Sequence, residues 1–340
     1  MRDGDWVTQT GTEIRGVLKV MVDAGWLPGG AAVVGTDGMW EFVTVGSLAL
    51  ECGDAVPAPD VHYDTASLTK VMATWPLIGQ AIAGGALHLD VPVGEYVPGG
   101  PYPGGSVTIR QILTHTSRMS PVIWLERYVG TGQDLAEALL SEPLEEEGYR
   151  YIDHGFILLG LLLERVLGDP LDHLAADLWT SVGMPATTYG PLPRSRNVAP
   201  TERRIAGAAP TWGVVHDEAA ALMGGVAGHA GVFTTVTDLG SYARELLRIH
   251  AGGDSHDPMT QYLRESWRGY VNAGDHCSRG LAWLVSDDGV VYHNGYTGTS
   301  LFLHPQTGRY VGLLTNAVHN GRRRPGLLDL RTVAHAAFAA

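Results

Sequence analysis

Lysine is almost absent from this chain, which has two lysines against twenty-one arginines in 340 residues. Arginine keeps its proton in proteins, whereas a buried lysine changes its pKa readily and can act as a base. One of the two lysines, Lys70, stands three positions after Ser67, inside the apolar run of residues 66–84. Because lysine is so rare here, this position is the first candidate for chemistry.

Cysteine is equally scarce, and the two cysteines, Cys52 and Cys277, have no spacing typical of a metal or redox site. The first residues lack the apolar run of a secretory signal. The most apolar stretch, residues 155–163, is followed at once by Glu164 and Arg165, and is too short to cross a bilayer. We therefore expect a cytoplasmic protein without a disulfide framework or membrane contact.

Positive charge is also scarce, and the net charge is −13. The one dense basic run, residues 322–324, is interpreted as a solvated loop rather than a phosphate site. This balance argues against nucleic acid and anionic membranes as partners. The fourteen histidines show no His-x-x-x-His pattern, so we expect neither a catalytic metal nor a cofactor. The oligomeric state cannot be predicted.

Strand-like patterns occur at both ends of the chain and helical patterns occupy its middle. The strand-like runs are residues 31–35, 39–45, 280–285, 289–293, 299–304 and 309–315. The helical runs are residues 108–113, 134–141, 153–167, 171–181 and 238–250, with two terminal helices over 12–24 and 325–340. Hairpin turns between the strand-like runs favour an antiparallel sheet assembled from both chain ends.

The sequence therefore predicts an α+β fold, an antiparallel sheet flanked by helices with an inserted helical subdomain. We expect residues 1–90 and 215–340 to form the domain with the sheet, and residues 91–214 to form the mainly helical subdomain. The active site is expected in the cleft between them.

Ser67 and Lys70 lie on one face if this segment is helical, because positions i and i+3 are neighbours. A lysine with a lowered pKa beside a serine is one way to activate a weak nucleophile. Residues 63–66 place Ser67 at the start of the helix, where free N–H groups favour a developing anion. A chance match or a simple N-cap serine remains an alternative.

Two further segments carry candidate residues. Tyr151 precedes the apolar helix 154–168, with Asp153 as its N-cap, and a tyrosine near an ammonium group can act as a general acid or base. In residues 293–300, Gly295 lets a ligand carbonyl approach the backbone, and the N–H of Tyr296 can form half of an oxyanion hole. Alternatively, these are an ordinary tyrosine and an ordinary hairpin turn.

Taken in order, these motifs resemble those of the serine β-lactamase and penicillin-binding protein superfamily. The branch they resemble contains class C β-lactamases, D-alanyl-D-alanine carboxypeptidases, β-lactamase-fold esterases and related transacylases. The matching segments are residues 63–74 (YDTASLTKVMAT), 107–117 (VTIRQILTHTS), 151–168, 224–231 (GGVAGHAG), 293–300 and 314–316.

The resemblance implies the β-lactamase-like, or transpeptidase, fold and two-step acyl transfer. Ser67 attacks an ester, thioester or amide, Lys70 and Tyr151 relay its proton, and the N–H groups of Ser67 and Tyr296 hold the oxyanion. His293 orients the Tyr151–Lys70 pair or contacts the incoming nucleophile. Asp153 holds Lys70 by a hydrogen bond.

Departures from the family pattern narrow the expected substrate. Tyr-Ser-Asn is replaced by Tyr-Ile-Asp at 151–153, and an aspartate cannot offer the donors of an asparagine amide. Lys-Thr-Gly is replaced by His-Asn-Gly at 293–295, which removes a cation that would bind a carboxylate. Arg118 stands where relatives commonly have glycine, and can shape a substrate loop. Trp124 can line an acyl or alcohol pocket, or belong to the core.

These features favour an esterase or transacylase that acts on a small-molecule ester or acyl substrate. The alternatives are a β-lactamase or D-amino-acid peptidase with the same chemistry, and a non-catalytic binding domain. The sequence allows two roles for His229, which either lines the cleft or packs in a tight turn. It also allows two roles for the arginines next to Glu202, which either form a salt bridge within the loop or bind a substrate carboxylate. Hydrolysis and acyl transfer cannot be distinguished, because both pass through the same acyl-enzyme.

Overall fold

The computed structural model describes residues 1–122, 124–205 and 207–339. Its main element is an eight-stranded antiparallel sheet in the order β2-β1-β11-β10-β9-β8-β7-β6. The strands are β1 (Gly29–Gly35), β2 (Trp40–Gly46), β6 (Val271–Gly274), β7 (Cys277–Arg279), β8 (Leu284–Ser286), β9 (Val291–Asn294), β10 (Ser300–His304) and β11 (Arg309–Thr315). Because β1 pairs with β11, the two ends of the chain share one sheet.

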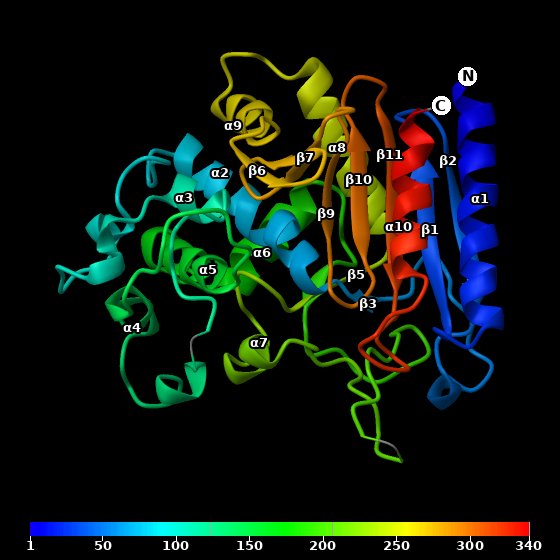
Figure 1. Ribbon diagram of the computed structural model, residues 1–340, viewed down its shortest axis with the longest axis horizontal. Coiled ribbons are helices and arrows are strands. Elements are labelled where there is room, and N and C mark those ends of the chain that lie inside the picture. Colours follow the sequence, from blue (N-terminus) through cyan, green and yellow to red (C-terminus); the bar gives the residue numbers. More distant parts are fainter. Residues whose placement is uncertain (123, 206, 340) are drawn as a thin grey trace.

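Helices cover both faces of this sheet and extend beyond it (Figure 1). They are α1 (Asp3–Asp23), α2 (Trp75–Ala83), α3 (Ile109–Leu113), α4 (Leu135–Ser141), α5 (His154–Leu167), α6 (Leu171–Ser181), α7 (Glu218–Leu222), α8 (Val236–Gly252), α9 (Pro258–Ser266) and α10 (Leu327–Ala336). In Figure 1, α1 and α10 lie on one face, and α8 lies on the other. A small sheet joins β3 (Tyr63–Asp64), β5 (Val232–Thr234) and β4 (Thr188–Tyr189).

The alternation of side chains along the strands separates two hydrophobic cores. Ala32, Val34 and Phe302 pack with α1 and α10 in one core. Val33 and Leu301, from the alternate positions of the same strands, pack in the other core with α8. A residue's position in a strand therefore decides which face of the sheet it serves.

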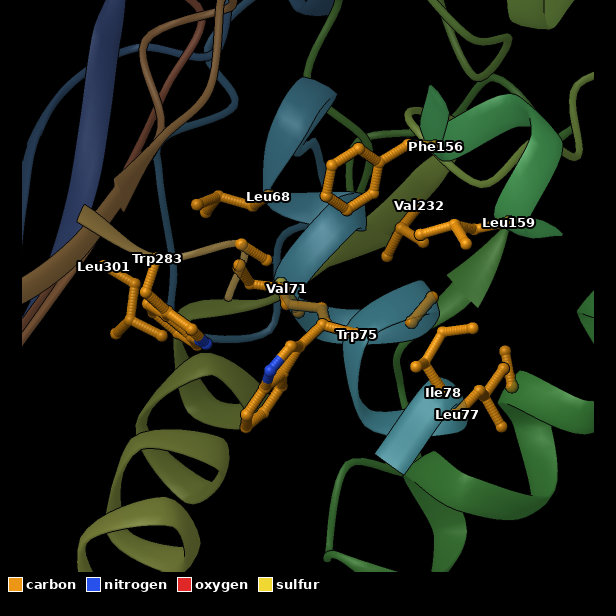
Figure 2. Close-up of a cluster of buried hydrophobic side chains, with 14 of the residues drawn as sticks. Leu68, Val71, Trp75, Leu77, Ile78, Phe156, Leu159, Val232, Trp283 and Leu301 are labelled. Atoms are coloured by element: carbon orange, nitrogen blue, oxygen red, sulfur yellow. The ribbon is translucent and has the colours of Figure 1, made fainter. Parts of the chain in front are cut away.

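The second core also surrounds the segment that carries Ser67 and Lys70 (Figure 2). Figure 2 shows Leu68, Val71 and Trp75 between Phe156 of α5 and Trp283, which lies before β8. The Trp75 indole N–H donates to Ser266 Oγ at 2.9 Å. The apolar side chains of this segment are thus packed in the core, which fixes the position of Ser67 and Lys70.

Most of the expected elements are confirmed, with a few corrections. The sheet assembled from both ends and the helical middle are present, but the N-terminal helix begins at Asp3 rather than residue 12. The predicted strand 280–285 is confirmed only at its end, in β8, because a turn with Ala282 at φ +70° occupies the residues between β7 and β8. The tail is helical over α10, and Ala340 lies outside the described residues.

No helix in the described ranges is long and apolar enough to span a membrane. The division of the chain at residues 91 and 214 stays a prediction.

Candidate active site

Ser67 stands on a strained turn at the start of a helical segment. A 3-10 turn (Ala66–Leu68) is followed by a π-helical turn (Lys70–Thr74), which leads into α2. Ala66 has a φ of +48°, a left-handed conformation that costs a non-glycine residue energy. The Asp64 carboxylate stabilises it by accepting the Ala66 N–H at 2.8 Å. The predicted place of Ser67 at a helix start is confirmed, and this turn presents it to the cleft.

Lys70 is fully buried, and each of its three N–H donors has an acceptor. Nζ lies 3.1 Å from Ser67 Oγ, 2.6 Å from Asp153 Oδ1 and 3.3 Å from the carbonyl oxygen of His229. The structure therefore confirms that Ser67 and Lys70 meet, and that Asp153 holds Lys70. Asp153 is the N-cap residue of α5, as expected, but its side chain makes no capping hydrogen bond, because its carboxylate pairs with Lys70 instead.

The protonation state of Lys70 differs from the expected one. Burial alone lowers the pKa of Lys70, but the charge of Asp153, together with Tyr151, outweighs burial, and the pKa of Lys70 is raised. Although burial opposes it, the charge of Lys70 correspondingly lowers the pKa of Asp153. The prediction of a lysine with a lowered pKa is therefore wrong, since an aspartate stands where an asparagine was the family pattern. Lys70 is an ammonium group at rest.

Tyr151 lies beside this pair, with the centre of its ring 5.1 Å from Lys70 Nζ. Its ring packs against the buried ring of His115 at 4.4 Å, and His115 Nδ1 accepts the backbone N–H of Ile152 at 3.2 Å. This contact confirms the structural role expected for His115. Because Tyr151 remains 39% exposed, its hydroxyl is open to a ligand while its ring is held in place.

Arg279 of β7 is a residue that the sequence did not reveal. It is buried, and its guanidinium lies 5.5 Å from the Tyr151 ring and donates to the Tyr149 hydroxyl at 2.8 Å. Among the described residues it has no carboxylate partner. No motif marked it, because it reaches the site only through the pairing of β7 with β8.

His293 lies in β9 on the same side of the sheet, with its ring 6.2 Å from that of Tyr151. It is buried, and neither ring nitrogen has a hydrogen-bond partner among the described residues. Burial and the charges of Arg279 and Lys70 hold the pKa of His293 well below its usual value. His293 is thus neutral and does not replace the missing lysine as a cation. Of the two roles expected for His293, orienting the Tyr151–Lys70 pair rests on this ring contact alone, and contact with an incoming nucleophile stays a prediction.

The two expected oxyanion donors are the backbone N–H groups of Ser67 and Tyr296. Within the described ranges, neither the N–H of Ser67 nor that of Tyr296 donates to an acceptor. A Cβ on Gly295 would lie 2.3 Å from the carbonyl oxygen of Thr65, so only glycine permits this approach of β9 to the Ser67 turn. Arg324 donates to the Tyr296 carbonyl oxygen at 2.8 Å and lies 4.2 Å from its ring. The loop is therefore held from behind, with its N–H free.

A cavity of about 310 Å³ lies next to Ser67. Its lining consists of Ala66, Ser67, Tyr151, Asp153, His216, Asp217, Glu218, Ala230, Tyr296 and Arg322. A second cavity of about 360 Å³ shares Tyr151 and Asp153 with it and contains Trp124, as expected. The side chain of His229 is buried beside both and bonds Asp217 at 2.8 Å.

One expectation about the arginines is corrected and one stays a prediction. Arg118 has a φ of +62°, which fits a position where relatives have glycine, and its side chain donates to the Glu145 carbonyl oxygen. Arg118 itself lines neither cavity with Tyr151 and Asp153, but Pro121 of its loop lines the larger one, so a substrate role of this loop stays a prediction. The basic run is not simply solvated, because Arg322 donates to both Glu202 and Glu218 at 2.8 Å.

The alternative of a loop salt bridge at residue 202 is confirmed, because Arg204 Nε lies 3.1 Å from the Glu202 carboxylate. No group of His, Cys, Asp and Glu side chains that could hold a metal occurs among the described residues.

Comparison with known proteins agrees with this geometry. A putative D-alanyl-D-alanine carboxypeptidase of Escherichia coli (strain K12) is 26% identical over 306 residues, covering 76% of this chain and 69% of that protein. An N-acetylmuramyl-L-alanine amidase of Bacillus subtilis (strain 168) is 27% identical over 303 residues, covering 76% and 68%. Among solved structures, a class C β-lactamase superposes with a TM-score of 0.77 over 98% of this chain and 97% of its own, at 17% identity.

A solved penicillin-binding protein homologue from Pyrococcus abyssi gives a TM-score of 0.75 over 96% of this chain and 76% of its own, at 18% identity. These likenesses confirm the β-lactamase-like fold expected from the sequence. The sequence model of the family described as Beta-lactamase matches residues 14–336, nearly the whole chain. The chain therefore belongs to the beta-lactamase family and is a serine hydrolase of the β-lactamase fold.

Proposed function

We propose that this protein is an esterase or transacylase that works through an acyl-enzyme on Ser67. The observation that carries the proposal is the contact of Lys70 with both Ser67 Oγ and Asp153, at 3.1 and 2.6 Å. Ser67 and Tyr296, whose backbone N–H groups have no acceptor among the described residues, line the same cavity. A nucleophile, a proton carrier and an oxyanion site are the parts that acyl transfer needs.

Because Lys70 is protonated at rest, it acts as a relay rather than as a free base. As Ser67 Oγ bonds to the carbonyl carbon and the leaving alkoxide departs, three protons move together. The Ser67 proton passes to Lys70, Lys70 gives one of its protons to Tyr151, and Tyr151 gives its phenol proton to the alkoxide. Lys70 and Tyr151 each end with the number of protons they began with, so the step balances. The N–H groups of Ser67 and Tyr296 hold the oxyanion, each contributing roughly 3 kcal/mol. Water or another nucleophile releases the acyl group by the reverse route.

The charges around Ser67 favour a neutral ester over a substrate with a free carboxylate. Asp153, Asp217 and Glu218 line the cavity, and the one guanidinium there, that of Arg322, already pairs with Glu218 and Glu202. At the position of the family's strand lysine, His293 is buried and neutral. The lining thus holds more carboxylates than cations. Lys70 is paired with Asp153, and Arg279 is buried beside the Tyr151 ring and is not among the described lining residues.

A D-alanyl-D-alanine carboxypeptidase is the second candidate function, because the E. coli relative at 26% identity bears that name. Such a substrate ends in a carboxylate and an amide, and Arg322 would have to leave its two carboxylate partners to bind it. A β-lactamase is a variant of the same candidate, because penicillins also carry a carboxylate.

The test is a comparison of kcat/KM for three substrates: p-nitrophenyl butyrate, nitrocefin and a peptide ending in D-Ala-D-Ala. We expect the ester to be preferred by at least about 100-fold, since rejection of a buried uncompensated charge costs several kcal/mol. Preference for the peptide or for nitrocefin would overturn the ester assignment in favour of the second candidate.

Adding a primary amine or an alcohol to the ester reaction separates the two forms of the proposal. A transacylase yields the new amide or ester in competition with hydrolysis, whereas an esterase yields the free acid alone. Failure of every substrate, together with failure of a fluorophosphonate to label Ser67, would leave the non-catalytic binding domain.

A further inference from the structure

A third cavity lies on the opposite face of β9, between that strand and α10. Its volume is about 390 Å³. The lining residues are Asp275, His276, Cys277, Ser286, Tyr292, Asn294, Phe302, Leu328, Arg331, Thr332, His335 and Ala336. Alternation along β9 separates the two sites, because His293 points to the Ser67 side while its neighbours Tyr292 and Asn294 line this cavity. Figure 1 shows α10 along this face of the sheet.

Arg331 supplies this cavity with an unmatched charge. Its Nε donates to Ser300 Oγ at 3.0 Å, and its Nη2 donates to the carbonyl oxygens of Gly295 and Thr299 at 2.7 and 3.1 Å. These bonds use three of the five N–H donors of a guanidinium. Nη1 has no hydrogen-bond acceptor among the described residues, yet it is not sealed in the interior.

No described carboxylate forms an ion pair with Arg331. Burial and the nearby charge of Arg324 lower the pKa of Arg331 to about 10, which still leaves it charged at neutral pH. The carboxylate in the lining, that of Asp275, is exposed to solvent and makes no ion pair with a described residue. Water screens its charge, whereas the partly buried guanidinium is screened less.

The rest of the lining tells what kind of anion fits. Tyr292, Phe302 and Leu328 give the cavity apolar walls, while Thr332 and His335 add polar groups on the same helix as Arg331. Ligand sites commonly combine apolar walls with a few polar groups that fix orientation. Nη1 keeps two N–H donors that diverge from one nitrogen, so it can donate a charge-assisted hydrogen bond to a singly charged anion such as a carboxylate.

We propose that this cavity binds a small organic acid whose carboxylate is held by Arg331 Nη1 and whose apolar body lies between α10 and β9. Arg331 also holds the loop that carries the Tyr296 N–H, through Gly295 and Thr299. An acid that bonds Nη1 therefore fixes the arginine that anchors this loop, so occupancy alters acylation of Ser67. The site is separate from the Ser67 cavity, and its existence does not depend on the substrate proposed above.

The test uses hexanoate and benzoate as probes, with hexanamide and benzamide as neutral controls of the same shape. Calorimetric titration of the Ser67→Ala variant measures binding without turnover. We expect each acid to bind at least about tenfold more tightly than its amide, because a hydrogen bond to a charged group contributes that much. Equal affinity of acid and amide, or no binding of either, would overturn the proposal.

Three variants place the ligand. Ala336→Trp fills the cavity without touching the Arg331 loop, and should abolish binding of acid and amide alike. Asp275→Asn removes the competing carboxylate and should tighten acid binding about two- to threefold at low salt, without changing amide binding. Arg331→Met should erase the preference for the acid, with folding checked by circular dichroism.

If Arg331→Met fails to fold, the other two variants keep the test complete. Acid binding that survives Ala336→Trp at full strength would place the acid elsewhere and overturn the assignment. If the wild-type protein binds the acids but does not turn over the ester, the proposed function is wrong and the acid site stands.

Discussion

Two cations lie on opposite faces of β9, and the structure treats them differently. On the nucleophile's side, Lys70 has an acceptor for every N–H donor and a carboxylate partner, Asp153, at 2.6 Å. On the α10 side, Arg331 is partly buried, has no described carboxylate partner and leaves Nη1 unused. A matched cation can pass protons without leaving a bare charge, whereas an unmatched cation attracts an anion from outside. The difference assigns catalysis to the Lys70 side of β9 and binding of an anion to the α10 side.

The largest effect should come from Ser67→Ala, which removes the nucleophile and leaves both cations in place. We expect ester turnover to fall by at least about 10⁴-fold, as for other nucleophile deletions. The measurement is the steady-state rate with p-nitrophenyl butyrate and covalent labelling by a fluorophosphonate. Labelling at full stoichiometry in this variant would show that another residue is the nucleophile.

Lys70→Arg should follow, with a loss of about 10²- to 10⁴-fold in kcat, because arginine keeps the charge but cannot relay a proton. The chain offers a matched control in its other lysine, Lys19, which pairs with Asp23 at 2.8 Å on the exposed surface of α1. Lys19→Arg should leave kcat unchanged. Near-native turnover of Lys70→Arg would remove the relay.

Asp153→Asn removes the carboxylate partner of Lys70, so Lys70 becomes a buried cation without a carboxylate partner, as Arg331 is. Without the carboxylate, burial lowers the pKa of Lys70, so the alkaline limb of the kcat/KM profile should move toward neutral pH. The profile is measured with p-nitrophenyl butyrate from pH 6 to about 10. Asp23→Asn, at the exposed Lys19 pair, is the control. An unmoved alkaline limb in Asp153→Asn would contradict the pairing.

The smallest effect concerns stability. Burial, with the nearby positive charges, holds the pKa of His115 and of His293 well below the usual value, so both stay neutral in the folded protein. Their stabilising contribution is complete above about pH 6.5 and is lost as pH falls, because the unfolded chain then binds protons that the folded chain does not.

The expected loss in the free energy of unfolding is about 1.4 kcal/mol per pH unit for each histidine. Urea unfolding between about pH 8 and 5 measures it. The variant His293→Gln should lose stability about half as steeply through these two groups. An equal slope in wild type and variant would show that His293 takes up a proton while folded.

Much of the fold and the core of the site could be predicted, because those features are local in sequence. The spacing of Ser67 and Lys70, the strand periods and Gly295 each follow from a few neighbouring residues. The presence of Tyr151 in the site and of Asp153 as the partner of Lys70 followed from the motif order. Even so, the raised pKa of Lys70 did not, because it depends on a distance of 2.6 Å that only the folded chain sets.

What could not be predicted depends on contacts between distant segments. Arg279 reaches Tyr151 through strand pairing, and Arg331 reaches the Gly295 loop from the last helix. Arg322 looked like part of a solvated run, yet it bridges Glu202 and Glu218 beside the nucleophile. With twenty-one arginines, the sequence did not indicate which of them contact the site, whereas with only two lysines it did indicate Lys70.

The most direct test of the central claim is mass spectrometry of the enzyme quenched in acid during turnover of p-nitrophenyl butyrate. We predict a butyryl group on the peptide that contains Ser67, formed within the lifetime of one turnover and absent in Ser67→Ala. Lys70→Arg should slow both formation and release of this adduct, because the same relay serves acylation and deacylation. A butyryl group on any other residue, or turnover with no covalent adduct, would contradict the account.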